Sequence, residues 1–189
     1  MYIKSRNLQA LQSQQMITEA LLSLMNAYPY SDITITQICQ EAKVVRQTFY
    51  RNFEFKIDIL EFYLDNMFQR FILDYPNDRK DMYHQLISFF DYLIIHKNFL
   101  ILIMKNNLFF LLNKTITNNI SKFSYVPKII ETIKAPKLDI YVLAFIASTI
   151  CSILSLWVKN DFKESTKMLA NLAKTFLSGI KKEMNLDTN

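Results

Sequence analysis

Glycine and proline are scarce in this chain. Gly179 is the single glycine among 189 residues, and there are only four prolines. Glycine ordinarily makes up about 7% of residues, and the tight turns of a sheet-rich fold depend on these two residue types. The shortage therefore excludes a sheet-rich fold and predicts an all-α protein, with 51% hydrophobic residues available for its core.

Cysteine is also rare, and it is not arranged for metal binding. Cys39 and Cys151 stand singly in apolar stretches, and His84 and His96 are isolated in the sequence. Such cysteines are usually buried free thiols, and their spacing does not fit a zinc site. No nucleophile–His–acid set or phosphate-binding loop is present. We therefore expect no metal, no cofactor, no catalytic residues and no enzymatic activity.

Strong charge of one sign is missing as well. The net charge is +5 and the pI about 9.1, which permits an acidic partner such as DNA. Residues 1–58, however, hold six basic and five acidic side chains, a difference of +1. DNA binding has to be argued from the placement of residues. The N-terminus lacks the apolar run of a signal peptide, so a cytoplasmic location is expected.

Residues 140–158 form the longest uncharged stretch, with 19 positions that carry no charge. This is long enough to cross a bilayer, but it also fits a helix buried within a soluble dimer. Ser148, Thr149, Ser152 and Ser155 recur every three or four residues and give the stretch one less apolar face. We favour the buried helix and expect no membrane contact; the membrane-associated alternative remains.

Apolar residues at helical spacing, interrupted by the prolines, predict a series of helices. Asn98 is expected to cap one of them, helical character weakens over 113–127, and Asp161 with Glu164 forms a capping-box-like start to the last helix. The expected helices span residues 7–28, 34–42, 46–52, 56–75, 78–96, 99–112, 137–159 and 162–184.

Residues 34–60 carry the most specific pattern in the chain. Two short helices joined by a tight turn lead into a longer one, which is typical of a helix-turn-helix unit. Phe49 and Phe53, four residues apart, would face inward. The intervening positions then place cationic, amide, hydroxyl and phenol groups on the outer side of the second helix. Such a surface suits a helix that lies in a DNA groove.

This segment resembles the signature of the tetracycline-repressor-type (TetR) family of transcription regulators. The matching residues are Thr34, Ile38, Cys39, Ala42, Val44, Thr48, Phe49, Tyr50, Phe53, Lys56, Ile59 and Leu60. Three positions depart from it. Lys43 replaces the turn glycine. If that position requires a positive φ, a lysine there costs about 1 kcal/mol of folding free energy. Val45 replaces the serine cap and cannot accept a backbone hydrogen bond. Glu54 replaces the proline after the second helix.

The resemblance implies a homodimer that reads a pseudo-palindromic operator in double-stranded DNA. Arg46 and Gln47 would contact base edges in the major groove. Phosphates would be held by the remaining candidates, which are Thr34, Thr36, Thr48, Tyr50 and Lys56. Arg51 could contact DNA or serve a solvated or intramolecular role. Tyr50 could instead pack on the head, and Thr34 would cap its helix in either case.

The resemblance also implies two domains, a three-helix DNA-binding head over residues 1–55 and a larger helical domain over 56–189. The helix over 56–75 would be shared, and the boundary could fall inside it. Dimerisation is expected through residues 137–159 and 162–184 in a four-helix bundle. Small residues that would allow close approach of the two chains are Ala144, Ala147, Ser148, Cys151, Ser155, Ala170 and Ala173.

The larger domain offers an effector pocket as one interpretation of its aromatic residues, and an ordinary core as the other. The candidate lining residues are Phe68, Phe89, Phe90, Tyr92, Phe99, Met104, Phe109, Tyr141 and Phe145. A ligand there would be small and apolar or aromatic, and would release a repressor from its operator. Control by a protein partner, without a pocket, is the alternative. Residues 153–177 resemble the subset of the family that regulates dihydroxyacetone kinase operons.

Overall fold

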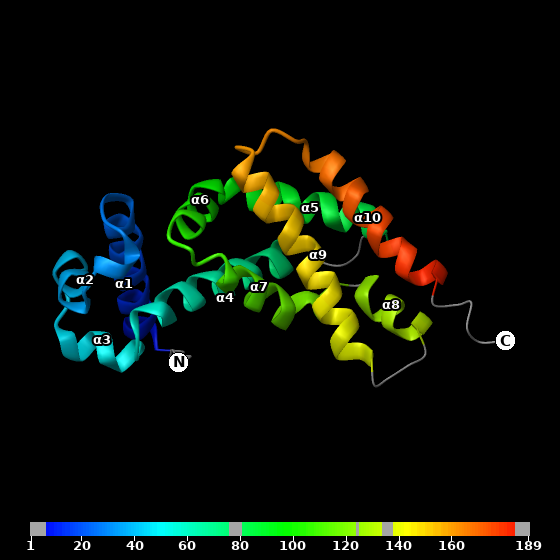
Figure 1. The fold of residues 1–189 in the computed structure, drawn as a ribbon. Helices are drawn as coiled ribbons and strands as arrows, with labels where there is room; N and C mark the ends of the chain where they lie inside the picture. The colour runs from blue at the N-terminus through cyan, green and yellow to red at the C-terminus, as the bar shows by residue number, and fades with distance from the viewer. Residues whose placement is uncertain (1–6, 76–80, 124, 134–137, 184–189) are drawn as a thin grey trace. The chain divides into compact units, whose positions relative to one another are not determined.

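The protein is described by a computed structural model over residues 7–75, 81–123, 125–133 and 138–183. Every regular element in these ranges is helical, which confirms the all-α prediction (Figure 1). The elements are α1 (Leu8–Ala27), η1 (a 3₁₀ turn, Tyr30–Asp32), α2 (Ile35–Glu41), α3 (Arg46–Asn52), α4 (Lys56–Asp74), α5 (Met82–Ile95), α6 (Lys97–Lys105), α7 (Phe110–Asn119), η2 (Ile120–Lys122), α8 (Tyr125–Ile133), α9 (Asp139–Lys159) and α10 (Thr166–Glu183).

The chain divides into two compact units, Met1–Met67 and Phe68–Asn189. The division falls inside α4, so this helix contributes residues to both units. The contacts therefore assign the first turns of α4 to the first unit. Each unit has its own buried core.

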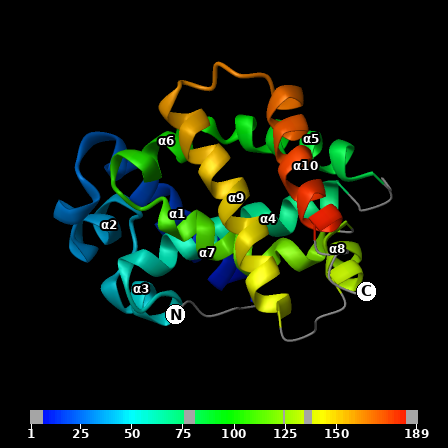
Figure 2. The ribbon, with the colours of Figure 1, turned by 45° about the vertical axis from the view of Figure 1, so that its right-hand side comes forward.

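The first unit is a small helical assembly in which α1 packs against α2 and α3 (Figure 2). Asn7 caps α1 through its side-chain oxygen, which accepts a hydrogen bond from the Gln9 N–H at 3.0 Å. The fully buried side chains at the centre of the unit are Ile17, Leu21, Ile33, Ile38, Phe49, Phe53, Ile59 and Leu60. The core thus draws on α1 to α4, and it fixes α2 and α3 by apolar burial.

The second unit is held together by aromatic packing. Phe71 lies 5.4 Å from Phe89 and 5.6 Å from Phe123, ring centre to ring centre. Phe90 meets Trp157 edge-on at 5.8 Å. Helix α10 packs on α5, and α9 runs across α7 (Figures 1 and 2). Ring pairs of this kind add about 0.5–1.5 kcal/mol each to the burial of their surface.

The predicted helix over 99–112 is wrong in its extent. Helix α6 ends at Lys105, and a new helix, α7, continues to Asn119, where helical character was expected to weaken. The break is a Schellman turn. Asn107 has a φ of 58°, and the N–H of Leu108 donates to the Ile103 carbonyl at 2.8 Å. Asparagine is the side chain that best tolerates this left-handed conformation.

The predicted start of the last helix at residue 162 is also wrong. Asp161 and Phe162 have positive φ values of 52° and 56° and complete the C-terminal turn of α9. The Phe162 N–H donates to the Trp157 carbonyl at 2.9 Å. Helix α10 begins at Thr166 instead, and the Ser165 hydroxyl accepts from the Met168 N–H at 3.3 Å. A serine four residues farther on therefore supplies the cap.

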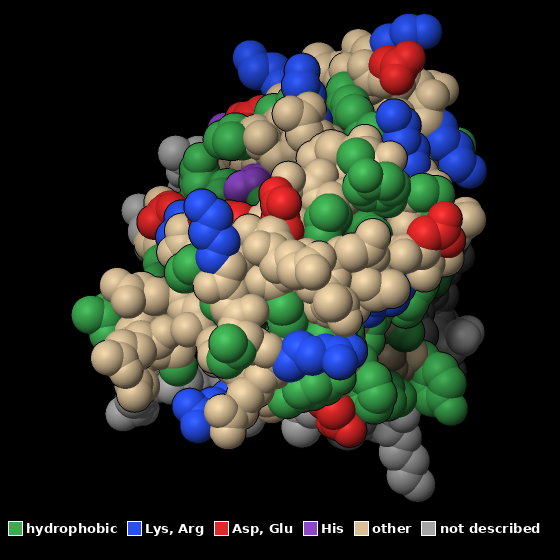
Figure 3. Space-filling model, turned by 90° about the vertical axis from the view of Figure 1, so that its left-hand side faces the viewer, with side chains coloured by type: hydrophobic (Ala, Val, Ile, Leu, Met, Phe, Trp, Pro, Cys, Tyr) green, Lys and Arg blue, Asp and Glu red, His purple; other side chains and the backbone are tan. Residues whose placement is uncertain are grey.

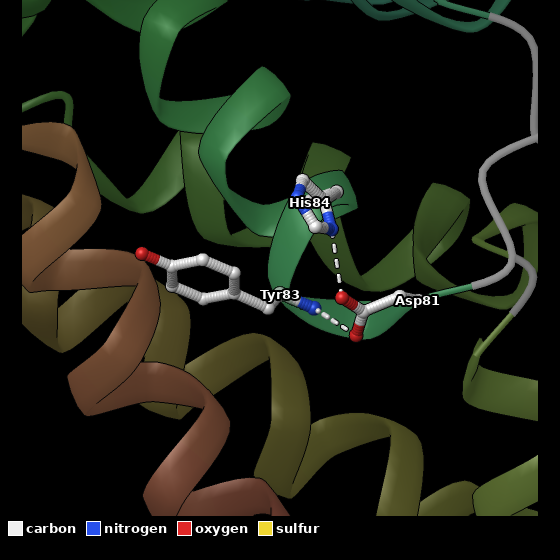
Figure 4. A network of polar contacts seen from close by, with 3 residues as sticks. All are labelled: Asp81, Tyr83 and His84. Carbon is white, nitrogen blue, oxygen red and sulfur yellow. Dashed lines mark hydrogen bonds and ion pairs between the residues drawn. The ribbon is translucent and has the colours of Figure 1, made fainter.

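The N-terminus of α5 is fixed by Asp81, which begins the described chain after residue 80 (Figure 4). One carboxylate oxygen accepts from the Tyr83 N–H at 3.0 Å, and the other lies 2.7 Å from His84 Nδ1. The backbone bond, followed by the His84 contact, lowers the pKa of Asp81. Residues 78–80 of the predicted helix lie outside the described chain, so α5 is defined from Met82.

Helix α9 is the one described helix that is long and apolar enough to cross a membrane, with a mean hydropathy of 2.1. Core helices of soluble proteins meet the same criterion. Here Trp157 is 2% exposed and Ile146, Ile150 and Leu154 are fully covered. Cys151, like Cys39, is a buried free thiol, as predicted. Burial raises its pKa to about 12, so the thiol is chemically quiet.

Candidate nucleic-acid interface

The turn between α2 and α3 is a Schellman motif built without glycine. The N–H of Val44 donates to the Cys39 carbonyl at 2.9 Å, and the N–H of Lys43 donates to the Gln40 carbonyl at 3.1 Å. Lys43 has a φ of 54°, the conformation that the position of the missing glycine suggested. The two bonds satisfy the last carbonyls of α2 and set its angle to α3.

The start of α2 is a complete capping box. Thr34 Oγ1 accepts from the Gln37 N–H at 3.2 Å, and Gln37 Oε1 accepts from the Thr34 N–H at 2.8 Å. This confirms the predicted pairing of Thr34 with Gln37. The Thr34 hydroxyl also donates to Gln37 Oε1 at 2.8 Å. A phosphate contact by Thr34 would therefore have to be made by a hydroxyl that already caps the helix. Thr36, two residues after Thr34 in the first turn of α2, is exposed.

Helix α3 turns four of the predicted DNA-contacting side chains to the outside. Arg46, Gln47, Tyr50 and Arg51 are all exposed, and 53% of Tyr50 is accessible. Phe49 is fully buried and meets the Tyr50 ring edge-on at 5.3 Å, which holds the phenol on the outer side. The helix thus presents a cation, an amide and a phenol together, which suits base and phosphate contacts.

Two neighbours of this face have different surroundings. Thr48 is only half-buried, and its carbonyl accepts from the buried Asn52 side chain at 2.8 Å. Val45 occupies the N-cap of α3, makes no side-chain cap bond and is 66% exposed. The missing cap was expected from the sequence. Without a capping side chain, the helix is about 1 kcal/mol less stable than with serine at this position.

The surface around this helix is not strongly basic. In the view of Figure 3, from the side on which α2 and α3 lie in Figure 1, Lys and Arg side chains are scattered among acidic ones. This agrees with the small net charge counted over residues 1–58. Contacts made by particular side chains, and not a broad positive field, must therefore carry any preference for DNA.

Lys56 turns its ammonium toward the chain itself, and the phosphate contact suggested by the sequence stays a prediction. Its ammonium donates to the backbone carbonyls of Tyr30, Ser31 and Ile33 at 2.6, 3.1 and 2.8 Å. It also lies 4.3 Å from the centre of the Tyr30 ring. An ammonium has three N–H donors, and these three carbonyls use all of them. Burial lowers the pKa of Lys56, an effect that the charge of Asp32 opposes.

Asp58 is a polar residue of this region that the sequence reasoning missed. It is 3% exposed, and its Oδ2 accepts from the Glu54 and Phe55 N–H groups at 3.0 and 2.9 Å. Burial acts to raise the pKa of Asp58, but hydrogen bonds that include these two hold it below its ordinary value. The sequence did hold a signal for this role: Asp58 is an acidic residue in the first turn of α4, and the preceding Phe55 cannot cap that helix with its side chain.

The predicted effector residues do not all share one surrounding. Phe68, Phe89 and Phe90 are buried in the packed core of the second unit, whereas Tyr141 and Phe145 are 69% and 52% exposed on α9. The other candidates are Phe99 and Tyr92, which are buried, and Met104 and Phe109, which are half-buried. Helical spacing had placed all of them on apolar faces, but it could not tell which face each helix turns inward.

A different hollow lies between α9 and α10. It has a volume of about 400 Å³. Its lining is mostly apolar and consists of Ile153, Leu156, Trp157, Asn160, Glu164, Met168, Leu169, Asn171, Leu172 and Thr175. None of these residues was among the predicted effector contacts. The Trp157 indole N–H donates to the Glu164 carbonyl at 2.9 Å and so anchors the join of the two helices.

No protein-family model matches this chain. The chain is 35% identical over 71 residues to an HTH-type transcriptional activator of the dhaKLM operon, DhaS, from Lactococcus lactis subsp. lactis (strain IL1403). That match covers 38% of this chain and spans about a third of the relative, 36% of its length.

Among solved structures, the fold is similar to that of a dihydroxyacetone kinase operon activator, DhaS. The TM-score is 0.58 and the identity 22%, over 90% of this chain and 97% of that one. At this identity the likeness establishes a shared all-α fold. The sequence match and the fold together connect this chain with helical transcription regulators.

Proposed function

We propose that this protein is a cytoplasmic transcription regulator that binds double-stranded DNA through α3. The observation that carries the proposal is the exposed set of Arg46, Gln47 and Tyr50 on a helix fixed by a Schellman turn on one side and by Phe49 beneath. Arg46 and Gln47 have the donor geometry to read guanine and adenine. Tyr50 is suited to hold a phosphate. The similar helix-turn-helix activator supports this assignment.

Dimerisation through α9 and α10 completes the proposal. Tyr141, Phe145 and Leu156 are exposed on α9 at spacings that keep them on one face, and Phe176 is exposed on α10. An outward apolar face over two adjoining helices marks a protein contact. Two copies joined in a four-helix bundle would place two α3 helices to read the halves of a pseudo-palindrome.

The small residues expected in that interface are divided by the structure. Ala147, Ala170 and Ala173 are fully buried, and Cys151 is 6% exposed, so they serve the packing of the chain itself. Ala144 and Ser148 are exposed between the apolar residues of α9 and remain available for close approach to a second copy.

Two further points are whether the protein represses or activates transcription, and which signal controls it. A repressor released by a small apolar effector was the expectation, but the similar protein is named an activator. Control by a protein partner is the alternative, and the close aromatic packing around Phe71 and Phe89 favours it. The hollow between α9 and α10 is the place where a small effector would be tested first.

Fluorescence anisotropy on labelled DNA from upstream of the protein's own gene tests the central proposal. We expect tight, salt-dependent binding that exceeds binding to scrambled DNA. Tyr50→Ala should weaken binding to both DNAs. Gln40→Ala, a change on the exposed side of α2, should leave binding unaltered and serves as the matched control. Absence of binding to any DNA at low salt would refute the proposed function.

A further inference from the structure

The first turn of α4 contacts the segment before α2 and the segment after α3. Lys56 reaches back to the loop that precedes α2, and Asp58 closes the segment that follows α3. We call Lys56 and Asp58 together the α4 clamp. The two segments that the clamp contacts both lie within the first unit.

The Lys56 side of the clamp is specific in its placement. The last of its three carbonyls belongs to Ile33, the residue directly before the Thr34 cap of α2. The first belongs to Tyr30, whose ring also faces the ammonium. Carbonyls that converge on one point require a compact donor. The ammonium of lysine satisfies this requirement and the planar guanidinium of arginine does not.

The Asp58 side of the clamp acts immediately after α3. Phe53 is the C-cap of that helix, and the N–H groups of the next two residues, Glu54 and Phe55, both donate to Asp58. Between the segments that Lys56 and Asp58 contact, the chain forms α2, the Schellman turn at Lys43 and α3. The α2–α3 pair is therefore held before α2 by Lys56 and after α3 by Asp58.

We propose that Lys56 is a positioning residue for DNA reading, which sets α2 and α3 on the start of α4 and does not itself bind phosphate. This inference rests on the proposed function. Loss of the ammonium would remove its bonds to three carbonyls, although that of Tyr30 keeps a bond from the Ile33 N–H, and would release the loop before Thr34. The side chains of Arg46 and Gln47 would then reach the groove in a less fixed orientation, and operator affinity would fall.

Operator titrations across a salt series, with Lys56→Met and Lys56→Arg beside the wild type, separate the two roles. A phosphate contact contributes about 0.9 to the slope of log K against log salt concentration. We expect Lys56→Met to weaken binding by about ten- to a hundredfold with an unchanged slope, since bonds to a charged donor are lost. The unfolding midpoint should fall by roughly 2–4 °C or more. Lys56→Arg should not restore affinity.

Several results would overturn the inference. A slope reduced by about one per subunit, or full affinity in Lys56→Arg, would show that Lys56 holds a phosphate. Unchanged affinity of folded Lys56→Met would reduce its role to stability alone. Binding is compared at a temperature where circular dichroism shows each variant to be fully folded.

A second variant covers the case in which Lys56→Met does not fold. Tyr30→Leu removes the ring that faces the ammonium and leaves the three carbonyls in place. We expect a smaller loss of operator affinity at an unchanged slope, whereas a phosphate-binding Lys56 would leave affinity unaltered. Wild-type protein that binds no DNA would refute the proposed function itself. Wild-type binding with a reduced slope in Lys56→Met would refute only the positioning role.

Discussion

The outward faces of α3 and α9 differ in chemistry although both helices bury their other side in an apolar core. Helix α3 shows Arg46 and Gln47 to the outside, whereas α9 shows Tyr141, Phe145 and Leu156. Hydrogen-bond donors suit the phosphates and base edges of DNA, and apolar side chains suit another protein surface. The comparison supports the proposal of nucleic-acid contact for one helix and of chain–chain contact for the other.

The two faces also differ in how they are fixed. The surroundings of α3 depend on polar joints, which include the Thr34 capping box and the carbonyls around Lys56. Helix α9 depends on burial of Trp157 and its neighbours. Single polar joints are worth about 1 kcal/mol each, while a buried aromatic ring is worth several. Substitutions in the two regions should therefore have effects of different size.

The largest effect is expected on the inner side of α9. Trp157→Ala should lower the free energy of unfolding by about 3–5 kcal/mol, because it leaves a cavity and removes the indole N–H bond to the Glu164 carbonyl. Urea denaturation followed by circular dichroism measures the loss. Phe145→Ala, on the outer side of the same helix, is the control at low protein concentration. Equal destabilisation by both would contradict the assignment of inner and outer faces.

The next effect concerns assembly. Phe145→Asp should weaken dimerisation by about 2 kcal/mol or more, because it places a charge in the centre of an apolar contact. Analytical ultracentrifugation over a concentration series measures the shift toward monomer. Leu73→Asp introduces the same charge at a position on α4 that is 76% exposed. A dimer that persists in the Phe145 variant would place the interface elsewhere.

The sequence predicted the first unit better than the second because its signals are local. The Thr34 box, the left-handed conformation at Lys43 and the inward pair of Phe49 and Phe53 each depend on residues a few positions apart. The structure agrees with all of these. The intramolecular bonds of Lys56 could not be predicted, because its partners, the carbonyls of residues 30, 31 and 33, lie more than twenty positions away in the chain.

Helix boundaries in the second unit were missed for a related reason. Asn107, Asp161 and Phe162 adopt positive φ values without glycine, so the residue that usually marks the end of a helix is absent from these turns. The candidate effector residues fall in different surroundings because apolar spacing identifies a face without its direction. Phe90 and Phe145 both follow helical periodicity, yet one is buried and the other exposed. Only the packing of distant helices decides between them.

An effect of intermediate size is expected on DNA discrimination. Arg46→Ala should reduce the preference for the operator over scrambled DNA by about 1–3 kcal/mol, because one base-reading fork is lost. Tyr50→Ala should weaken binding to both DNAs alike. Competition titrations at fixed salt concentration measure the ratio. If both variants lower affinity for every sequence equally, the division between base reading and phosphate contact is wrong.

The smallest effects concern the caps of α2 and α3, which should respond in opposite directions. Thr34→Ala removes the capping box and should lower the free energy of unfolding by about 1 kcal/mol, whereas Val45→Ser adds a cap that α3 lacks and should raise it by a similar amount. Thermal unfolding of the two variants measures both changes. Thr36→Ala, an exposed threonine inside the first turn of α2, should have little effect and controls for the substitution itself.

The Val45 variant also tests why α3 carries an apolar residue where a cap would be more stable. If Val45→Ser gains stability and keeps its affinity for the operator, the valine has no part in DNA reading. If stability rises while operator affinity falls, the exposed valine contributes to the contact, as apolar side chains do at the methyl group of thymine. Operators with deoxyuridine in place of thymine would then bind wild type and variant equally. That result would place an apolar contact beside the polar ones of Arg46 and Gln47 on α3.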